Sequence, residues 1–379
     1  MLRITGLEIT IVMRITFLLG GLNMTGGTKV VSIYAEHLRR RGHEIQVVSR
    51  GERKPTLKSR LKSAMTRGVL SSPVTTPQSF FDNSNVNVIR TKDYGPITES
   101  DVPDSDVVVA TWWETAEWMS QLGKSKGAKA HFIQCQEGYP LFKDRQRVDR
   151  TAALYKQPFS KITISKSLVL WLESQYGCDP RAITLIPNAV DTNQFHAKVR
   201  GKQEYPTVGF LYHFDPTKGV DVSLKALGIV SSKYHNLQIL AFGSYHPTTE
   251  RPLPDVVKFH FSPAQDQIRD IYSNCDVWLC GSRIEGFHLP PLEAMACRCP
   301  VVSTLVGGPD QIVQNGLNGF IVDVDDVNGL ADRLMNVLNL CDNDWRAMSA
   351  AAFETTQGYT WEDATDRFEA ALVNTVRDQ

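Results

Sequence analysis

Short apolar runs alternate with amphipathic stretches along most of the chain. The first apolar run, residues 14–19, ends in two glycines and is followed by a helical pattern over residues 28–41. A Gly-His turn then leads into a second apolar run at residues 44–49. The order strand, loop, helix and strand predicts a parallel β-sheet, because the helix returns the chain to the start of the next strand.

The same alternation continues through two successive units. Further strands are predicted in the first unit at residues 86–89, 107–110, 130–133, 162–164 and 183–186. A polar stretch, residues 196–206, interrupts the pattern before it restarts. The second unit is predicted to contain strands at 207–211, 237–242, 257–259, 277–280, 301–303 and 320–322, and helices at 220–231, 265–273, 290–296, 327–340 and 361–376. This pattern predicts two doubly wound α/β domains, with ligands at the carboxyl ends of the strands and in the cleft between the units. Residues 1–12 add little to the pattern and are interpreted as an upstream extension.

Composition and charge exclude several classes of protein. A length of 379 residues suits about two domains of ~100–200 residues each. Hydrophobic residues make up 42% of the chain and charged residues 22%, which is typical of a globular protein and not of a disordered one. The 41 basic residues equal the 41 acidic ones, which argues against a dedicated nucleic-acid binder.

The chain is expected to be cytoplasmic. No uncharged apolar run approaches the ~20 residues of a membrane-spanning helix. Glu8 and Arg14 interrupt the apolar N-terminal stretch, which disfavours a secretory signal. The 7 cysteines are odd in number and irregular in spacing, which favours reduced thiols over disulfides or a zinc site.

Residues 282–300 carry the clearest chemical signal. A predicted strand ends near Cys280, a loop follows, and Pro290-Pro291 suits the first turn of a helix. The free amides at this helix start are available to an anion. They belong to Phe287, His288 and Leu289.

Two carboxylates, Glu285 and Glu293, bracket this helix start. Carboxylates would repel a phosphate directly, but they suit hydroxyl groups on either side of one, such as those of a sugar ring and of a ribose. The alternative is that both side chains only complement the helix dipole. The residues themselves leave these two interpretations open.

The spacing of Glu285 and Glu293 resembles the E-x7-E signature of retaining GT-B glycosyltransferases of family 4, the group 1 transferases. Further segments resemble this family in the same order, at residues 20–27, 186–195, 218–221, 307–310 and 316–320. The resemblance covers nearly the whole chain. It implies a GT-B fold of two Rossmann-like domains that face each other across a cleft. It also implies an acceptor-side domain (1–198), a donor-side domain (199–358) and a C-terminal helix (359–379) that packs back on the first domain.

The resemblance also implies roles for individual residues. Lys218 and Glu285 are expected to be catalytic, with Lys218 on the donor diphosphate and Glu285 on the donor sugar. The diphosphate is also expected to meet Gly26, Gly27 and the amides of Phe287, His288 and Leu289. Glu293 is expected to bind the ribose, and the nucleobase is expected near Pro263. The expected partners are a nucleotide-sugar donor, with UDP-glucose or a relative favoured by family frequency, and a saccharide or lipid-linked acceptor. No cofactor and no metal are expected, and polysaccharide or glycoconjugate biosynthesis is the expected setting.

Three departures from the family pattern stand out. His288 occupies a position that is usually glycine. Tyr212-His213 precede Lys218 where relatives often carry an arginine. Many relatives carry a histidine where this chain has Gln134-Cys135-Gln136-Glu137. A subset of bacterial polysaccharide-building members resembles this chain at these positions. Residues Trp113, Glu114 and Glu137 are the expected acceptor side, although Trp112 and Trp113 equally suit core packing.

Some signals remain open or point elsewhere. Residues 50–67 contain seven basic residues and one acidic residue, which suits either a solvated segment or peripheral contact with an anionic membrane. The D-x-D patterns at 104–106 and 323–325, and the Y-x-x-x-K pattern at 139–143, are interpreted as chance or capping. A sugar-nucleotide 2-epimerase, or an inactive nucleotide-sugar binder on the same fold, is the alternative function.

Overall fold

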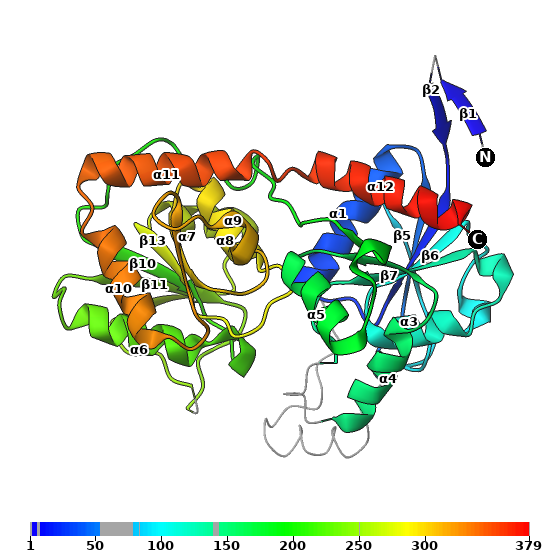
Figure 1. Cartoon of the computed structure of the whole chain (residues 1–379), viewed down its shortest axis with the longest axis horizontal. Helices are drawn as coiled ribbons and strands as arrows, with labels where there is room; N and C mark the ends of the chain where they lie inside the picture. Colours follow the sequence, from blue (N-terminus) through cyan, green and yellow to red (C-terminus); the bar gives the residue numbers. More distant parts are fainter. Residues whose placement is uncertain are drawn as a thin grey trace, which may run out of the picture. The chain divides into compact units, whose positions relative to one another are not determined.

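The computed structural model describes residues 2–5, 8–53, 79–82, 84–138, 144–249 and 251–378. The chain forms two compact units, and neither is a single stretch of sequence (Figure 1). Unit 1 comprises Met1–Ile162, Tyr176–Thr184 and Thr365–Gln379, and unit 2 comprises Thr163–Gln175 and Leu185–Ala364. The predicted return of the C-terminal helix to the first unit is therefore confirmed. None of the described helices is both long and apolar enough to cross a membrane.

Unit 1 is built on a seven-stranded sheet with the order β5-β4-β3-β6-β7-β8-β9. Strand β3 lies at the point where the strand order reverses, and it pairs in parallel with both β4 and β6. Its interior side chains are fully buried because helices cover both faces of the sheet. The strands are β3 (Arg14–Leu19), β4 (Glu44–Ser49), β5 (Asn87–Arg90), β6 (Val107–Ala110), β7 (Ala128–Ile133), β8 (Ser160–Thr163) and β9 (Ile183–Leu185).

The helices that pack on this sheet are amphipathic. Helix α1 (Gly26–Arg40) buries Val30, Val31, Tyr34 and Leu38, which recur at helical spacing. Helix α12 (Trp361–Arg377) buries Phe368 against this apolar face of α1. The remaining elements are α3 (Trp113–Ser120), α4 (Arg145–Tyr155), η1 (Glu99–Asp101), η2 (Lys124–Lys126), η4 (Pro180–Ala182) and the antiparallel pair β1 (Leu2–Thr5) and β2 (Glu8–Ile11).

Unit 2 is built on a six-stranded parallel sheet with the order β12-β11-β10-β13-β14-β15. Its core contains Phe210, Leu279 and Trp345, which are almost completely buried. The indole of Trp345 donates a hydrogen bond to the carbonyl oxygen of Asp276 at 2.9 Å. The strands are β10 (Thr207–Leu211), β11 (Gln238–Gly243), β12 (Val257–Phe261), β13 (Val277–Cys280), β14 (Val301–Thr304) and β15 (Gly319–Val322).

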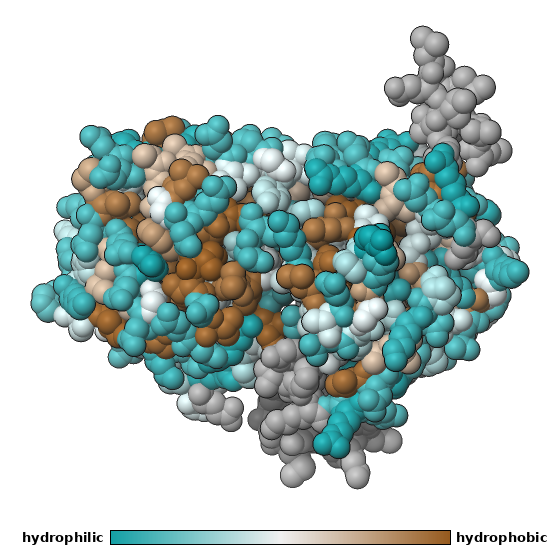
Figure 2. Space-filling view, viewed as in Figure 1, coloured by the Kyte–Doolittle hydropathy of each residue, from teal (hydrophilic) through white to brown (hydrophobic). Residues whose placement is uncertain are grey.

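Helices cover both faces of the unit 2 sheet. They are α6 (Val220–Ser231), α7 (Gln265–Ser273), α8 (Leu289–Ala296), α9 (Pro309–Ile312), α10 (Val327–Leu338) and α11 (Asp342–Thr356), with the short helix η5 (Pro216–Lys218) before α6. Helix α5 (Lys166–Tyr176) follows β8, and most of it is grouped with unit 2. Most of the face in view is hydrophilic, and apolar side chains gather beside the region of α8 and α9 (Figure 2).

The strands and helices expected from the hydrophobic pattern are present, and their ends differ from the structure by no more than two residues. The pattern missed the helices α3, α4, α5, α9 and α11 and the strands β1 and β2. Helix α3 begins at Trp113, which is buried in the core of unit 1. The missed helices have low amphipathicity or follow directly on another element, so the apolar spacing does not mark them.

Candidate active site

The candidate site of unit 2 starts with two loops that are drawn together by a glycine. Strands β10 and β13 are parallel neighbours, so the loops that follow them leave the same edge of the sheet. Gly219, between η5 and α6, has φ of 55°. A Cβ atom at this position would lie 1.8 Å from the carbonyl oxygen of Gly281, so no other residue fits. The chain around Lys218 is therefore held against the loop that leads to Glu285.

Arg283 locks the same two loops by its side chain and its backbone. Its backbone N–H donates to the carbonyl oxygen of Thr217 at 2.7 Å. Its guanidinium group donates to both carboxylate oxygens of Asp221, at 2.9 and 2.8 Å, and to Asp325 at 2.7 Å. The hydrogen bonds with Asp221 raise the pKa of Arg283 above its usual value. Sequence reasoning did not identify this arginine, because its partners in η5, in the first turn of α6 and in the loop after β15 are all distant from it in the sequence.

Glu285 lies at the centre of the site. Its side chain is 6% exposed and accepts hydrogen bonds from Lys218 Nζ at 2.9 Å (Oε1) and 2.8 Å (Oε2). Ser282 Oγ donates to Oε1 at 2.9 Å, and His288 Nδ1 lies 3.0 Å from the same oxygen. Burial alone would raise the pKa of Glu285, but His288 and Lys218 together hold it well below its usual range. Glu285 is therefore a carboxylate anion in the folded protein.

His288 has a backbone conformation that favours glycine. It caps the N-terminus of α8 with φ of 71° and ψ of 80°. This left-handed region is rarely occupied by residues with a Cβ atom, which explains why glycine is the usual residue in the family. The neighbouring amides of Phe287 and Leu289 flank the same helix start, as expected. Behind them, the N–H of Gly308 donates to the carbonyl oxygen of Phe287 at 2.5 Å, so the loop after β14 supports this turn.

Glu293 lies one helical turn further along α8 and is also buried. Its Oε2 accepts a hydrogen bond from the Tyr272 hydroxyl of α7 at 3.0 Å. Burial and the adjacent Glu293 raise the pKa of Tyr272 well above its usual value, so the hydroxyl remains a donor. A buried, hydrogen-bonded carboxylate in the helix interior exceeds what complementing a helix dipole requires. Sequence reasoning missed Tyr272, since a tyrosine in an amphipathic helix is usually a core residue.

The other unit 2 residues of interest lie further along the same sheet edge. Pro263 stands between β12 and α7, directly after Ser262, whose φ is 42°. His213 follows β10, and its Nδ1 accepts a hydrogen bond from the backbone N–H of Asp215 at 3.0 Å. Burial, followed by the charge of Lys218, lowers the pKa of His213.

Unit 1 holds the remaining predicted residues. Gly26 and Gly27 form the first positions of α1, and a Cβ atom on Gly27 would lie 3.6 Å from Gln134 Nε2. Trp113 begins α3, and the guanidinium of Arg150 lies 4.6 Å from the centre of its ring. Glu114 contacts Arg50 at 3.3 Å.

Glu137 is separated in its contacts from Trp113 and Glu114. It is fully buried, accepts a hydrogen bond from the Tyr155 hydroxyl at 3.2 Å and lies 3.3 Å from His131 Nε2. Burial and the negative charge of Glu137 raise the pKa of Tyr155 well above its usual value. The three expected acceptor-side residues therefore have different partners, which are His131 and Tyr155 for Glu137, Arg150 for Trp113 and Arg50 for Glu114.

The secondary motifs have local partners. Asp104 pairs with Lys126 at 2.9 Å, Asp106 with Arg14 at 3.0 Å, and Asp325 with Arg283. The part of the chain that the structure describes contains no group of three or more His, Cys, Asp or Glu side chains able to hold a metal ion, and all 7 cysteines are free thiols. The basic segment beyond Arg53 and the pattern at 139–143 lie outside the described residues.

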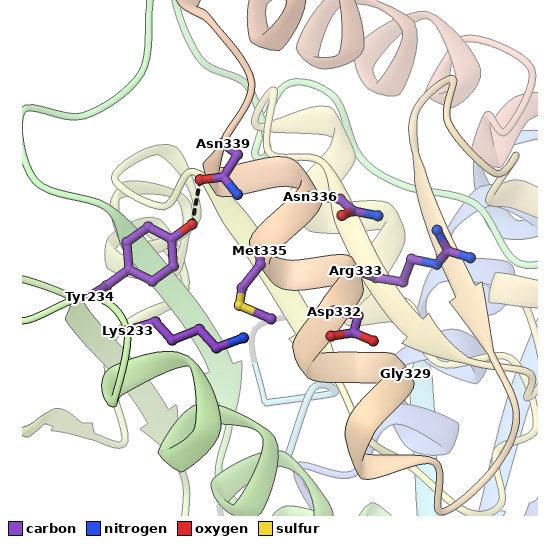
Figure 3. Close-up of a pocket in the computed structure, with 8 residues that line it drawn as sticks. All are labelled: Lys233, Tyr234, Gly329, Asp332, Arg333, Met335, Asn336 and Asn339. Atoms are coloured by element: carbon purple, nitrogen blue, oxygen red, sulfur yellow. Dashed lines mark hydrogen bonds between the residues drawn. The ribbon is translucent and has the colours of Figure 1, made fainter.

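A shallow surface concavity lies between α6 and α10, and none of the predicted site residues lines it (Figure 3). The Tyr234 hydroxyl donates a hydrogen bond to Asn339 at its rim. Its polar, open character suits a solvated groove between two packed helices. It is lined by Lys233, Tyr234, Gly329, Asp332, Arg333, Met335, Asn336 and Asn339.

Comparison with solved structures identifies the class of fold. Sucrose-phosphate synthase from Thermosynechococcus elongatus aligns with a TM-score of 0.74 at 18% identity, over 97% of this chain and 100% of that one. The Anabaena protein HepE, solved in complex with UDP-glucose, aligns with a TM-score of 0.71 at 17% identity, over 97% and 100% of the two chains. Two α/β units with parallel sheets and these neighbours define a GT-B fold, as predicted.

Two family models match successive parts of the chain. Glycosyltransferase Family 4 matches residues 24–194, and Glycosyl transferases group 1 matches residues 191–354. Together the two models span residues 24–354 of the chain, and they support a glycosyltransferase of the GT-B type. D-inositol 3-phosphate glycosyltransferase of Mycolicibacterium smegmatis is 27% identical over 227 residues, which is 55% of this chain and 51% of that protein. The match thus spans about half the length of this curated relative.

Proposed function

We propose that the protein is a retaining glycosyltransferase that transfers a hexose from a nucleoside diphosphate sugar to a saccharide or lipid-linked acceptor. UDP-glucose or a closely related sugar nucleotide is the proposed donor. The observation that carries the proposal is the buried Glu285 carboxylate, which contacts Lys218 at 2.8 Å beside the N-terminus of α8. A cation, the amides of a helix N-terminus and a buried carboxylate in one site are the groups that a sugar diphosphate requires.

The diphosphate would bind at the start of α8. Lys218 supplies a positive charge, and the amides of Phe287, His288 and Leu289 supply hydrogen-bond donors at the positive end of the helix dipole. These groups need no metal to stabilise the charge that develops on the leaving diphosphate. The proposed reaction is therefore independent of metal ions, with Lys218 in the role of the charge-stabilising group.

The two glutamates would bind hydroxyl groups of the donor. Glu285 is held as an anion and would orient the transferred sugar, whereas Glu293 would bind the ribose diol. The Tyr272 hydroxyl donates a hydrogen bond to Glu293 Oε2 and so fixes the orientation of the carboxylate that would bind the ribose. Support for a uridine nucleotide comes from HepE, whose structure contains UDP-glucose, and from the fold that it shares with this chain.

The chemistry follows from this placement. The bond between the anomeric carbon and the diphosphate oxygen breaks with oxocarbenium character at that carbon. The acceptor hydroxyl attacks from the same face and passes its proton to the departing diphosphate, so that the configuration is retained. The protein contributes mainly by positioning both reactants and by stabilising charge on the leaving group. Gly26 and Gly27 leave room at the start of α1 for a close backbone approach to the donor.

A screen of nucleotide sugars tests the proposal. UDP and UDP-hexoses should raise the melting temperature, because a ligand that binds only the folded state stabilises it by mass action. Addition of EDTA should leave this shift unchanged. The donor that gives the largest shift should then transfer its sugar to a panel of saccharides and polyprenyl pyrophosphates, with an anomeric configuration in the product that NMR identifies as retained. Release of an epimerised sugar, an inverted product, or a strict need for Mg²⁺ or Mn²⁺ would contradict the proposal.

A further inference from the structure

One buried carboxylate in unit 2 has two basic partners. Lys218 Nζ contacts both oxygens of Glu285, and His288 Nδ1 contacts Oε1 at 3.0 Å. The two partners differ in how firmly they are placed. The His288 side chain is 5% exposed and lies three residues from Glu285 in the same loop, whereas Lys218 is 28% exposed and comes from a different loop.

When a sugar diphosphate binds, Glu285 and the diphosphate compete for the ammonium group of Lys218. Its ammonium group is bound to Glu285 by two short contacts, and the same group is the proposed ligand of the diphosphate. A compact ammonium group on a flexible stem can pass from one anion to the other. Its departure would leave a buried carboxylate with less charge compensation, which is strongly unfavourable when no other partner remains.

His288 supplies that other partner. Its backbone has φ of 71°, a conformation in which glycine would avoid strain, so the histidine carries a cost that its side chain must offset. The ring is aimed at Glu285 and buried against it, and a protonated Nδ1 donates a hydrogen bond to Oε1. Ser282 Oγ donates to the same oxygen at 2.9 Å, so the carboxylate keeps two donors from its own loop.

We propose that His288 is a positioning residue that keeps Glu285 anionic and oriented when Lys218 moves from Glu285 to the diphosphate of the donor. The inference rests on the proposed function for the identity of the anion that attracts Lys218. The Lys218–Glu285 ion pair is then a contact of the ligand-free protein, and a contact between Lys218 and the diphosphate replaces it when the donor binds. It also gives a role to a residue that breaks the family pattern.

The first test needs no ligand. The K218M substitution is made in the parent protein and in the H288G background, and the four melting temperatures form a double-mutant cycle. K218M should lower the melting temperature by several degrees more in the H288G background than in the parent, because only there does Glu285 lose both basic partners. K233M, at an exposed lysine outside the site, should cost the same in both backgrounds. Equal costs of K218M in the two backgrounds would overturn the proposal.

The second test measures UDP binding by calorimetry. H288G should weaken UDP binding by at least about tenfold, the effect of losing one hydrogen bond to a charged group, because Lys218 is then retained by Glu285. H288N should lose less UDP affinity than H288G does, since asparagine tolerates positive φ and keeps an N–H donor. E285Q added to H288G should restore the affinity of E285Q alone, which a merely structural role of His288 would not produce.

The two tests separate two kinds of failure. Parent-like UDP affinity in H288G, or no restoration by E285Q, would overturn the role of His288. If the parent binds no nucleoside diphosphate, the proposed function fails, and the melting-temperature cycle still decides whether His288 supports Glu285.

Discussion

Phe368 of α12 stacks on Tyr34 of α1, with ring centroids 4.3 Å apart and planes inclined by 18°. Phe368 also packs edge-on against Phe132 of β7 at 5.1 Å and is completely buried. The residue thus joins a segment near the C-terminus to the core of unit 1, which is otherwise built from the first half of the chain. This aromatic contact is fully buried on the side of Phe368.

Phe368→Ala should therefore destabilise unit 1 strongly. Removal of a buried phenylalanine side chain costs about 3–5 kcal/mol, because apolar contacts are lost and a cavity remains. Denaturant unfolding followed by circular dichroism measures the loss. Val376→Ala, at a partly exposed position of the same helix, is the matched control and should have little effect. A small effect of Phe368→Ala would show that α12 contributes little to unit 1.

Charged contacts between α12 and the segment after α1 should make the stability of unit 1 sensitive to acid. Glu369 accepts hydrogen bonds from Arg41 at 2.8 Å and lies 3.0 Å from His43 Nε2. Burial opposes ionisation of Glu369, but Arg41 and His43 hold its pKa below the usual range. A carboxyl group with a lowered pKa contributes stability above its unfolded value of about 4.3, and this contribution is lost as the pH falls through the lower folded value.

Glu369→Gln removes this titration. The variant should be less stable than the parent at pH 7, and the difference in the free energy of unfolding should shrink as the pH falls below about 4.3. Urea titrations at several pH values between 3 and 7 measure the free energies of unfolding of the parent and of the variant. A difference that stays constant over this range would assign the effect to packing and not to charge.

The two glutamates of the site should differ in their kinetic effects. Glu293→Ala should weaken UDP binding by about 1–3 kcal/mol, because a charged hydrogen-bonding group on the ribose is lost. Glu285→Ala should lower kcat more than it changes UDP affinity, because this residue orients the sugar that reacts. Calorimetry with UDP and initial rates with the UDP-sugar measure the two quantities. Equal and small effects from both variants would return these residues to the role of helix capping.

Gly219→Ala tests whether the two loops of the site must touch. An added methyl group meets the Gly281 carbonyl oxygen at 1.8 Å and also strains a residue with positive φ, so both stability and donor affinity should fall. Gly228→Ala in the interior of α6 is the control, because a Cβ atom there meets no atom within 4 Å. The control should gain about 0.5–1 kcal/mol of stability from helix propensity. Similar behaviour of both variants would show that the loops can separate without cost.

Local signals in the sequence were sufficient for most strands and helices and for the position of the two glutamates near the start of α8. Strands and helices follow from apolar spacing, and the E-x7-E pattern with Pro290-Pro291 correctly places Glu285 and Glu293 around the start of α8. These features are local, because each depends on residues within a few positions of one another. The GT-B fold followed from the resemblance of several such segments in order.

Contacts between distant segments could not be predicted in this way. Lys218 and Glu285 are 67 positions apart, and Arg283 and Asp325 are 42 apart, so no spacing rule relates them. His288 is instructive because its departure from glycine was visible, while its contact with Glu285 depends on a left-handed backbone that the sequence does not reveal. The acceptor-side residues were grouped by resemblance, which did not indicate that Glu137 is buried against His131 and Tyr155.

The discontinuous composition of unit 1 has a consequence for folding during synthesis. Segment Thr365–Gln379 leaves the ribosome after all of unit 2 has been made. Until then, the ring of Phe368 does not cover Tyr34 and Phe132, and this apolar face of the first half of the chain stays exposed. Unit 2 can complete its core earlier, so the nascent chain is expected to fold its second unit first, with the first unit open to chaperones in the interval.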